Sequence, residues 1–95
     1  MRTPEGKVKD KVVKILKQYG VYYFFPVAGG FGMSGIPDII CCHNGRFIAI
    51  ECKAGKNKTT ALQDAHLARI RAAGGVAVVI NEENVNGLAE TIGCE

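Results

Sequence analysis

The sequence lacks the segments that mark a membrane or exported protein. No run approaches the roughly 18 consecutive apolar residues that a membrane span needs, and the first ten residues, MRTPEGKVKD, contain no apolar stretch like that of a signal peptide. No long polar or repetitive tract is present, and 47% of the residues are apolar, as in ordered globular proteins. We therefore expect a single cytoplasmic domain over residues 1–95.

The sequence also lacks the cysteine patterns of a disulfide framework or a zinc site. It has four cysteines, but none forms a CxxC pair and none is spaced with histidine as metal ligands are. Cys41 and Cys42 are adjacent, Cys52 lies in an apolar run and Cys94 is near the end of the chain. We expect these side chains to be small buried hydrophobic groups in a reducing compartment.

Basic residues are absent from the last twenty positions, which contain four glutamates. By contrast, residues 1–20 and residues 46–71 each carry six basic and two acidic side chains. This distribution predicts a basic face and an acidic face. Lysines on solvated helix faces would explain it equally well, so a phosphate-binding surface needs support from a site.

The chain alternates between helical and extended patterns. Thr3 and Pro4 are typical of a helix start, and apolar residues recur at helical spacing until Gly20. Strands are predicted at 21–27, 36–42, 46–52 and 76–80, a helix at 60–73 and a short helix near 84–92. Because the strands at 36–42 and 46–52 are apolar on both faces, we expect an α/β fold whose sheet has helices on both sides.

Asn44 and Gly45 join two apolar strands, which is a strong hairpin signal because a type I′ turn needs positive φ at both positions. Counting outward from this turn places Asp38 directly opposite Glu51, with Lys53 on the same face. Two facing carboxylates repel each other, and a divalent cation between them would turn that repulsion into coordination. The alternative is an ion pair between Lys53 and one of the two carboxylates, which would leave the other carboxylate without a partner.

Oxygen ligands of this kind suit Mg²⁺ or Mn²⁺, which also bind substrate phosphates. Such an ion activates water and stabilises charge on phosphorus. Lys53, beside it, could orient the water or neutralise the transition state. The pattern thus indicates a metal-dependent enzyme acting on a phosphate ester.

Pro37-Asp38, a spacer of twelve residues and Glu51-Cys52-Lys53 resemble the signature of the PD-(D/E)xK nuclease superfamily. The SGIPD block at 34–38 and the IECK block at 50–53 resemble those of a stand-alone VRR-NUC domain of the phage and bacterial kind. The resemblance implies a restriction-endonuclease-like core, ordered helix, three strands, helix, strand, with a mixed sheet flanked by helices.

The resemblance also implies roles for individual residues. Asp38 and Glu51 would be metal ligands together with the carbonyl of Cys52, and Lys53 would be the catalytic lysine. Glu5 would reach the metal directly or through water, although a carboxylate in a first helical turn is also favoured by the helix dipole.

Gln63 matches a glutamine beside the active site of such families. It also fits a capping box with Thr60, and the two roles remain open. Ser34, in the glycine-rich loop, and Lys56 and Lys58, just beyond the acidic cluster, are candidate contacts to nucleic-acid phosphates.

The resemblance implies an endonuclease that hydrolyses phosphodiester bonds in DNA, with branched DNA such as four-way junctions as the expected substrate. Relatives of this single-domain form resemble archaeal junction resolvases, which act as homodimers, and this resemblance implies a homodimer here. A chain of this size buries only about 60 to 65% of its unfolded surface, so a partner subunit would add burial. The alternatives are a flap- or end-processing nuclease and a nucleic-acid-binding module without catalysis.

Overall fold

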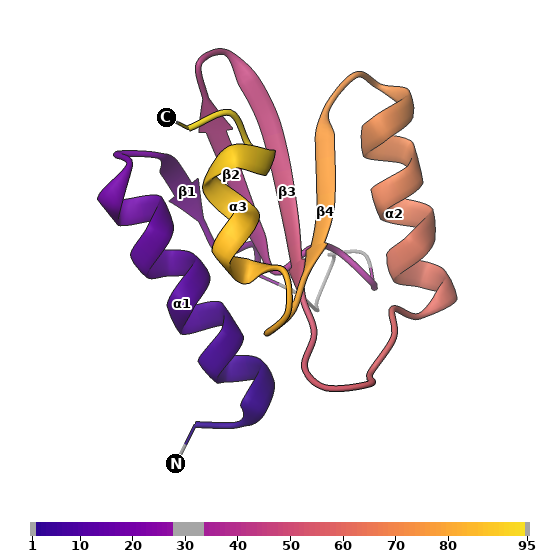
Figure 1. Ribbon diagram of the computed structural model, residues 1–95. Coiled ribbons are helices and arrows are strands. Elements are labelled where there is room, and N and C mark those ends of the chain that lie inside the picture. The colour runs from indigo at the N-terminus through magenta and orange to yellow at the C-terminus, as the bar shows by residue number, and fades with distance from the viewer. Residues whose placement is uncertain (1, 28–33, 95) are drawn as a thin grey trace.

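The computed structural model describes residues 2–27 and 34–94, and these form a four-stranded sheet with helices on both faces (Figure 1). In chain order the elements are α1 (Pro4–Gln18), β1 (Tyr22–Phe24), β2 (Ile39–His43), β3 (Arg46–Cys52), α2 (Ala61–Ala72), β4 (Val76–Ile80), the 3₁₀ turn η1 (Val85–Gly87) and α3 (Leu88–Thr91). None of the helices in this part of the chain is long and apolar enough to span a membrane.

Helix α1 begins where the sequence predicts. The side-chain oxygen of Thr3 accepts a hydrogen bond from the backbone N–H of Gly6 at 3.0 Å, and Pro4 takes the first helical position, where no N–H is needed. The helix buries Val8, Val12 and Leu16 against the sheet. Each such burial contributes about 1.5–3 kcal/mol, so packing rather than helix propensity holds α1 in place.

The sheet has the order β1-β2-β3-β4 and is mixed, because β1, β2 and β3 pair antiparallel whereas β3 and β4 pair parallel. Asn44 (φ 52°) and Gly45 (φ 77°) form the predicted hairpin turn between β2 and β3. The predicted register is confirmed from His43 opposite Arg46 at the turn to Ile39 opposite Ile50. The predicted pair of Asp38 and Glu51 lies one step beyond this ladder, because Asp38 precedes β2.

The two faces of the sheet have separate apolar cores. On one face, α1 and α3 cover β2 and β3, with Ile39, Ile48 and Ile50 fully buried. On the other face, α2 packs through Leu67 on Ala49 and Ala77. Figure 1 shows α2 on the far side of β4 from α1 and α3, so the expected three-layer arrangement is confirmed.

Three predicted elements differ clearly in their bounds, and the helix predicted at 60–73 is one residue shorter at each end. The first strand is Tyr22–Phe24 rather than 21–27, and the second begins at Ile39 rather than residue 36. The predicted helix near 84–92 divides into η1 and α3. The late start of β2 has a physical cause in Pro37, which has no N–H to donate to a neighbouring strand.

The cysteines are all free, but they are not all buried. Cys41 and Cys52 lie in the core, as expected, whereas Cys42 is exposed and Cys94 is partly exposed. Cys42 alternates with Cys41 along β2 and therefore points to the opposite face, where α2 does not reach it. The expectation of four buried thiols was wrong for Cys42, and Cys94 is only partly buried.

Candidate active site

Asp38 lies immediately before β2, and its Oδ2 accepts a hydrogen bond from the backbone N–H of Cys52 at 2.8 Å. Continuing the β2–β3 register would pair Cys52 with Pro37. Because the ladder ends at Ile39 and Ile50, the Asp38 side chain takes the place of a backbone partner for the Cys52 N–H. The Pro37-Asp38 pair thus ends the ladder and attaches a carboxylate to the end of β3.

The carbonyl of Cys52 points to the same side as its N–H. The backbone N–H of Lys53 donates to Ile80 on β4 at 2.9 Å, and the N–H and C=O groups of successive strand residues alternate between the two edges. The Cys52 carbonyl therefore faces the β2 side, where Asp38 lies. In the continued register the residue opposite Cys52 is Pro37, which has no N–H to donate to the Cys52 carbonyl.

Glu51 is 2% exposed, although its side chain carries an ionisable carboxyl group. It lies on the α2 face of β3, where its Oε2 accepts a hydrogen bond from Nε2 of Gln63 at 3.2 Å. The other end of the same amide, Oε1 of Gln63, accepts from the backbone N–H of Thr60 at 2.9 Å. Gln63 therefore takes part in the capping box and contacts the acidic cluster at once, so the two roles considered for it are compatible.

The pKa of Glu51 is raised from 4.5 to about 8. Burial is the main cause, and the neighbouring Asp38 adds repulsion and a hydrogen bond that favours the protonated form. The positive charge of Lys53 acts in the opposite direction. At neutral pH the site therefore favours either a proton or a cation beside Glu51.

Glu5 occupies the first turn of α1, at the same end of the sheet. It lines a cleft of about 230 Å³ together with Asp38 and Cys52. Lys9, one helical turn further along α1, lines the same cleft. Lys9 is not one of the predicted site residues, and its only signal in the sequence is its position four residues after Glu5.

The predicted nucleic-acid contacts are arranged around this end of the molecule. Ser34 is exposed, and its carbonyl lies 3.1 Å from Nε2 of His66 on α2. Most of the glycine-rich loop before it, residues 28–33, lies outside the described residues. Lys56 and Lys58 are exposed on the loop after β3, which is tied down where the Gly55 N–H donates to the Glu82 carboxylate at 3.0 Å.

The donor set fits a hard divalent cation with water ligands better than a closed protein cage. Within residues 2–27 and 34–94, no three His, Cys, Asp or Glu side chains are grouped as a ready metal site. Asp38, Glu51 and the Cys52 carbonyl nevertheless provide oxygen donors at one end of the sheet, and Mg²⁺ normally keeps several waters with only one or two carboxylates. Oδ2 of Asp38 accepts from the Cys52 N–H and Oε2 of Glu51 accepts from Nε2 of Gln63, so a backbone group and an amide hold the two carboxylates at this end of the sheet.

Comparison with known proteins agrees with this fold. No family model matches the chain. It is 29% identical over 85 residues to the "Putative nuclease p44" of Acyrthosiphon pisum secondary endosymbiont phage 1, with 88% of each protein covered. A solved structure described as a VRR_NUC domain matches with a TM-score of 0.74 and 25% identity, covering 93% of this chain and 96% of the other.

A second solved structure extends the likeness of fold. The Holliday junction resolvase Hjc of Archaeoglobus fulgidus matches with a TM-score of 0.60 and 22% identity, over 79% of this chain and 65% of that protein. The fold is thus the expected restriction-endonuclease-like α/β architecture. Sequence and fold together confirm the resemblance of this chain to the VRR-NUC domain nucleases.

Proposed function

We propose that residues 1–95 form a single nuclease domain, a Mg²⁺- or Mn²⁺-dependent endonuclease that hydrolyses phosphodiester bonds in branched DNA. The observation that carries the proposal is the pair of carboxylates at the end of β3, where Glu51 is buried beside Asp38 although their charges repel. Folding alone gains nothing from this pair, whereas a metal site requires it. The similarity to a phage protein named as a nuclease supports the same activity.

Asp38, Glu51 and the Cys52 carbonyl would hold the metal ion, and Glu5 would reach it directly or through water. When bound, such an ion lowers the pKa of a ligated water and stabilises negative charge on the phosphate. Gln63 keeps the Glu51 carboxylate oriented through its Nε2.

Lys53 directly follows Cys52, the last residue of β3, and its positive charge lowers the pKa of the Glu51 carboxyl group. Its ammonium group would orient the attacking water and offset the charge that builds on the phosphate. Lys56, Lys58 and Ser34 would contact phosphates of the flanking DNA.

The same site would serve a flap- or end-processing nuclease, so only the choice of substrate separates that alternative. A binding module without catalysis is less consistent with the geometry, because two adjacent carboxylates repel the phosphates that such a module must hold. The fold that this chain shares with a Holliday junction resolvase favours four-way junctions.

Cleavage of labelled four-way junction, flap and linear duplex is expected in Mg²⁺ or Mn²⁺ and not in chelator. Lys53→Ala is expected to lower the rate about a hundredfold or more, the loss typical of a missing catalytic proton-transfer group. Lys17→Ala, which removes the same charge from the last turn of α1, serves as the matched control and should retain the wild-type rate.

Preference for the junction would favour a resolving nuclease, and preference for the flap or the duplex end would favour the alternative. Cleavage that persists in chelator would refute the metal dependence. Tight junction binding with no cleavage of any substrate would establish the binding module instead.

A homodimer would complete this proposal, because a four-way junction presents two equivalent strands to a two-fold symmetric protein. Tyr22 and Phe24 on β1 and Phe47 on β3 lie on the face of the sheet that α2 only partly covers. They are 68%, 48% and 48% exposed. Aromatic residues bury about 150–250 Å² each when covered, so this aromatic face is well suited to a second copy of the chain.

Light scattering after size exclusion is expected to give twice the monomer mass for the wild type and the monomer mass for Phe24→Ser/Phe47→Ser. Leu62→Ser is the matched control, since Leu62 is 58% exposed on α2 rather than on the aromatic face. A monomeric wild type at micromolar concentration would contradict the dimer.

A further inference from the structure

Lys9 connects the active-site cleft to the surface beside it. Its side chain is partly buried and lines the cleft of about 230 Å³ that also exposes Asp38 and Cys52. It lines as well an adjoining hollow of about 360 Å³, which is bordered by Val13 and Phe25. The cationic side chain of Lys9 therefore lines the same cleft as carboxylates proposed to bind the metal.

The Lys9 ammonium is held in place by an aromatic ring from another part of the chain. Its Nζ lies 4.5 Å from the centroid of Phe25, a distance at which a cation is attracted to the face of the ring. Phe25 in turn packs edge-to-face on Tyr23, with ring centroids 5.7 Å apart. The chain just after β1 thus restricts a side chain that would otherwise be long and flexible.

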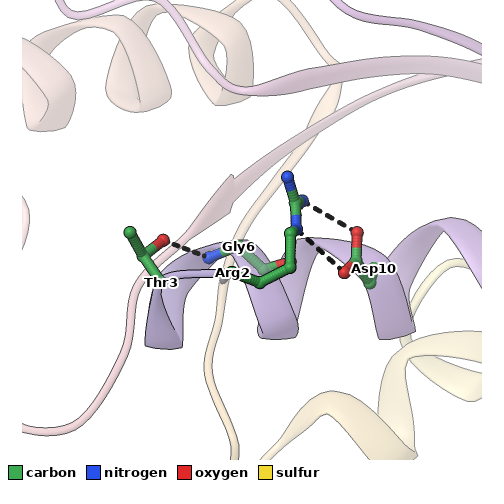
Figure 2. A network of polar contacts seen from close by, with 4 residues as sticks. All are labelled: Arg2, Thr3, Gly6 and Asp10. Carbon is green, nitrogen blue, oxygen red and sulfur yellow. Dashed lines mark hydrogen bonds and ion pairs between the residues drawn. The ribbon is translucent and has the colours of Figure 1, made fainter.

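Arg2 also lines both hollows, but its guanidinium group is already paired with a carboxylate. Its guanidinium donates to both carboxylate oxygens of Asp10, at 2.8 and 3.1 Å (Figure 2). It also donates to the Gly6 carbonyl at 3.1 Å. This is the ion pair formed among residues 2–27 and 34–94, and Lys9 takes no part in it. No salt bridge among these residues therefore engages Lys9, whose Nζ contacts the Phe25 ring instead.

We propose, on the basis of the nuclease function above, that Lys9 binds a backbone phosphate of the cleaved strand, next to the phosphate that reacts, and that Phe25 positions it. A metal ion on Asp38, Glu51 and Glu5 would bind only the reacting phosphate, whereas the next phosphate along the strand would still lie beside carboxylates and would be stabilised by a cation on the wall of the cleft. Figure 1 shows α1 and the loop after β3 on different sides of the lower end of β3. Lys9 and the Lys56–Lys58 loop would therefore contact the strand on either side of the acidic cluster.

The test compares DNA binding at several salt concentrations in a Lys53→Ala background, in Mg²⁺, so that the junction stays intact. Lys9→Gln is expected to lower the slope of log K against log salt by about 0.9 and to weaken binding at low salt. Lys9→Arg should restore both quantities, and Lys17→Gln, at the other end of α1, should change neither. Phe25→Leu should weaken binding but retain the slope, because the charge is still present.

Steady-state cleavage with Lys53 intact gives a second readout. Lys9→Gln is expected to raise KM about tenfold and to lower kcat by less, as befits a residue that binds the substrate rather than reacting with it. Circular dichroism melting of each variant identifies any loss of folding.

The outcomes separate this inference from the function on which it rests. Wild-type cleavage with Lys9→Gln equal to Lys17→Gln in slope, affinity and KM would overturn the Lys9 site and leave the nuclease intact. A slope that depends on Lys9 without any cleavage by the wild type would support the phosphate site and overturn the nuclease. Absence of DNA binding at low salt would overturn the phosphate site.

Discussion

Asp38→Asn is expected to reduce cleavage by about a thousandfold or more while the fold remains intact. Asp38 uses Oδ2 to accept the Cys52 N–H at 2.8 Å, and the amide oxygen of asparagine can accept the same bond. The amide NH₂ then replaces the second carboxylate oxygen, which the proposed metal needs. Loss of an outer-shell partner already costs about 10- to 100-fold, so loss of a ligand should cost more.

Calorimetric titration with Mn²⁺ and the cleavage assay would test this variant together. Glu90→Gln is the matched control, because Glu90 is exposed on α3 and does not line the cleft of Asp38. Mn²⁺ should bind the wild type and Glu90→Gln alike and Asp38→Asn far more weakly. Unchanged Mn²⁺ binding with unchanged cleavage would remove Asp38 from the ligand set.

Glu51→Gln is expected to stabilise the metal-free protein at alkaline pH. The folded-state pKa of Glu51 is about 8 against an ordinary value of 4.5, so folding favours the protonated form. Stability from this group is fully present below pH 4.5 and is lost as the pH rises through about 8. Since each pKa unit corresponds to about 1.4 kcal/mol, the loss amounts to a few kcal/mol, and glutamine, which does not ionise, avoids it.

Urea unfolding in chelator at pH 5 and pH 8 measures this difference. The wild type should lose stability between the two values, whereas Glu51→Gln should lose less and exceed the wild type at pH 8. Glu90→Gln, on an exposed residue of α3, controls for removal of a carboxylate. Saturating Mn²⁺ should restore the wild type at pH 8 but not Glu51→Gln, and equal pH dependence in all three proteins would contradict the buried charge.

Asp38→Asn and Glu51→Gln are expected to differ in their effects on stability. Asp38 is partly exposed and anchored by a backbone N–H, so its replacement should affect function without a large effect on folding. Glu51 is buried and repelled, so its replacement should improve stability and remove activity together. Such a trade between stability and function is typical of sites in which a ligand resolves an electrostatic conflict.

Local sequence determined the hairpin and the helix starts. Asn44 and Gly45 accept positive φ, so they define the turn, and the turn determines every pairing up to Ile39 and Ile50. Thr60 carries its own capping signal within four residues of chain. Features that depend on neighbouring residues or on one hairpin register could therefore be predicted without a structure.

The sequence could not determine where β2 begins, because that depends on whether Cys52 bonds to the Pro37 backbone or to the Asp38 side chain. It also left the role of Gln63 open, since a capping amide contacts Glu51 only once α2 packs on the sheet. The contact of Lys9 with Phe25 arises only when α1 and the chain after β1 are brought together. Short-range backbone preferences determine turns and caps, whereas contacts between distant side chains depend on how the layers pack, and only the tertiary structure decides that.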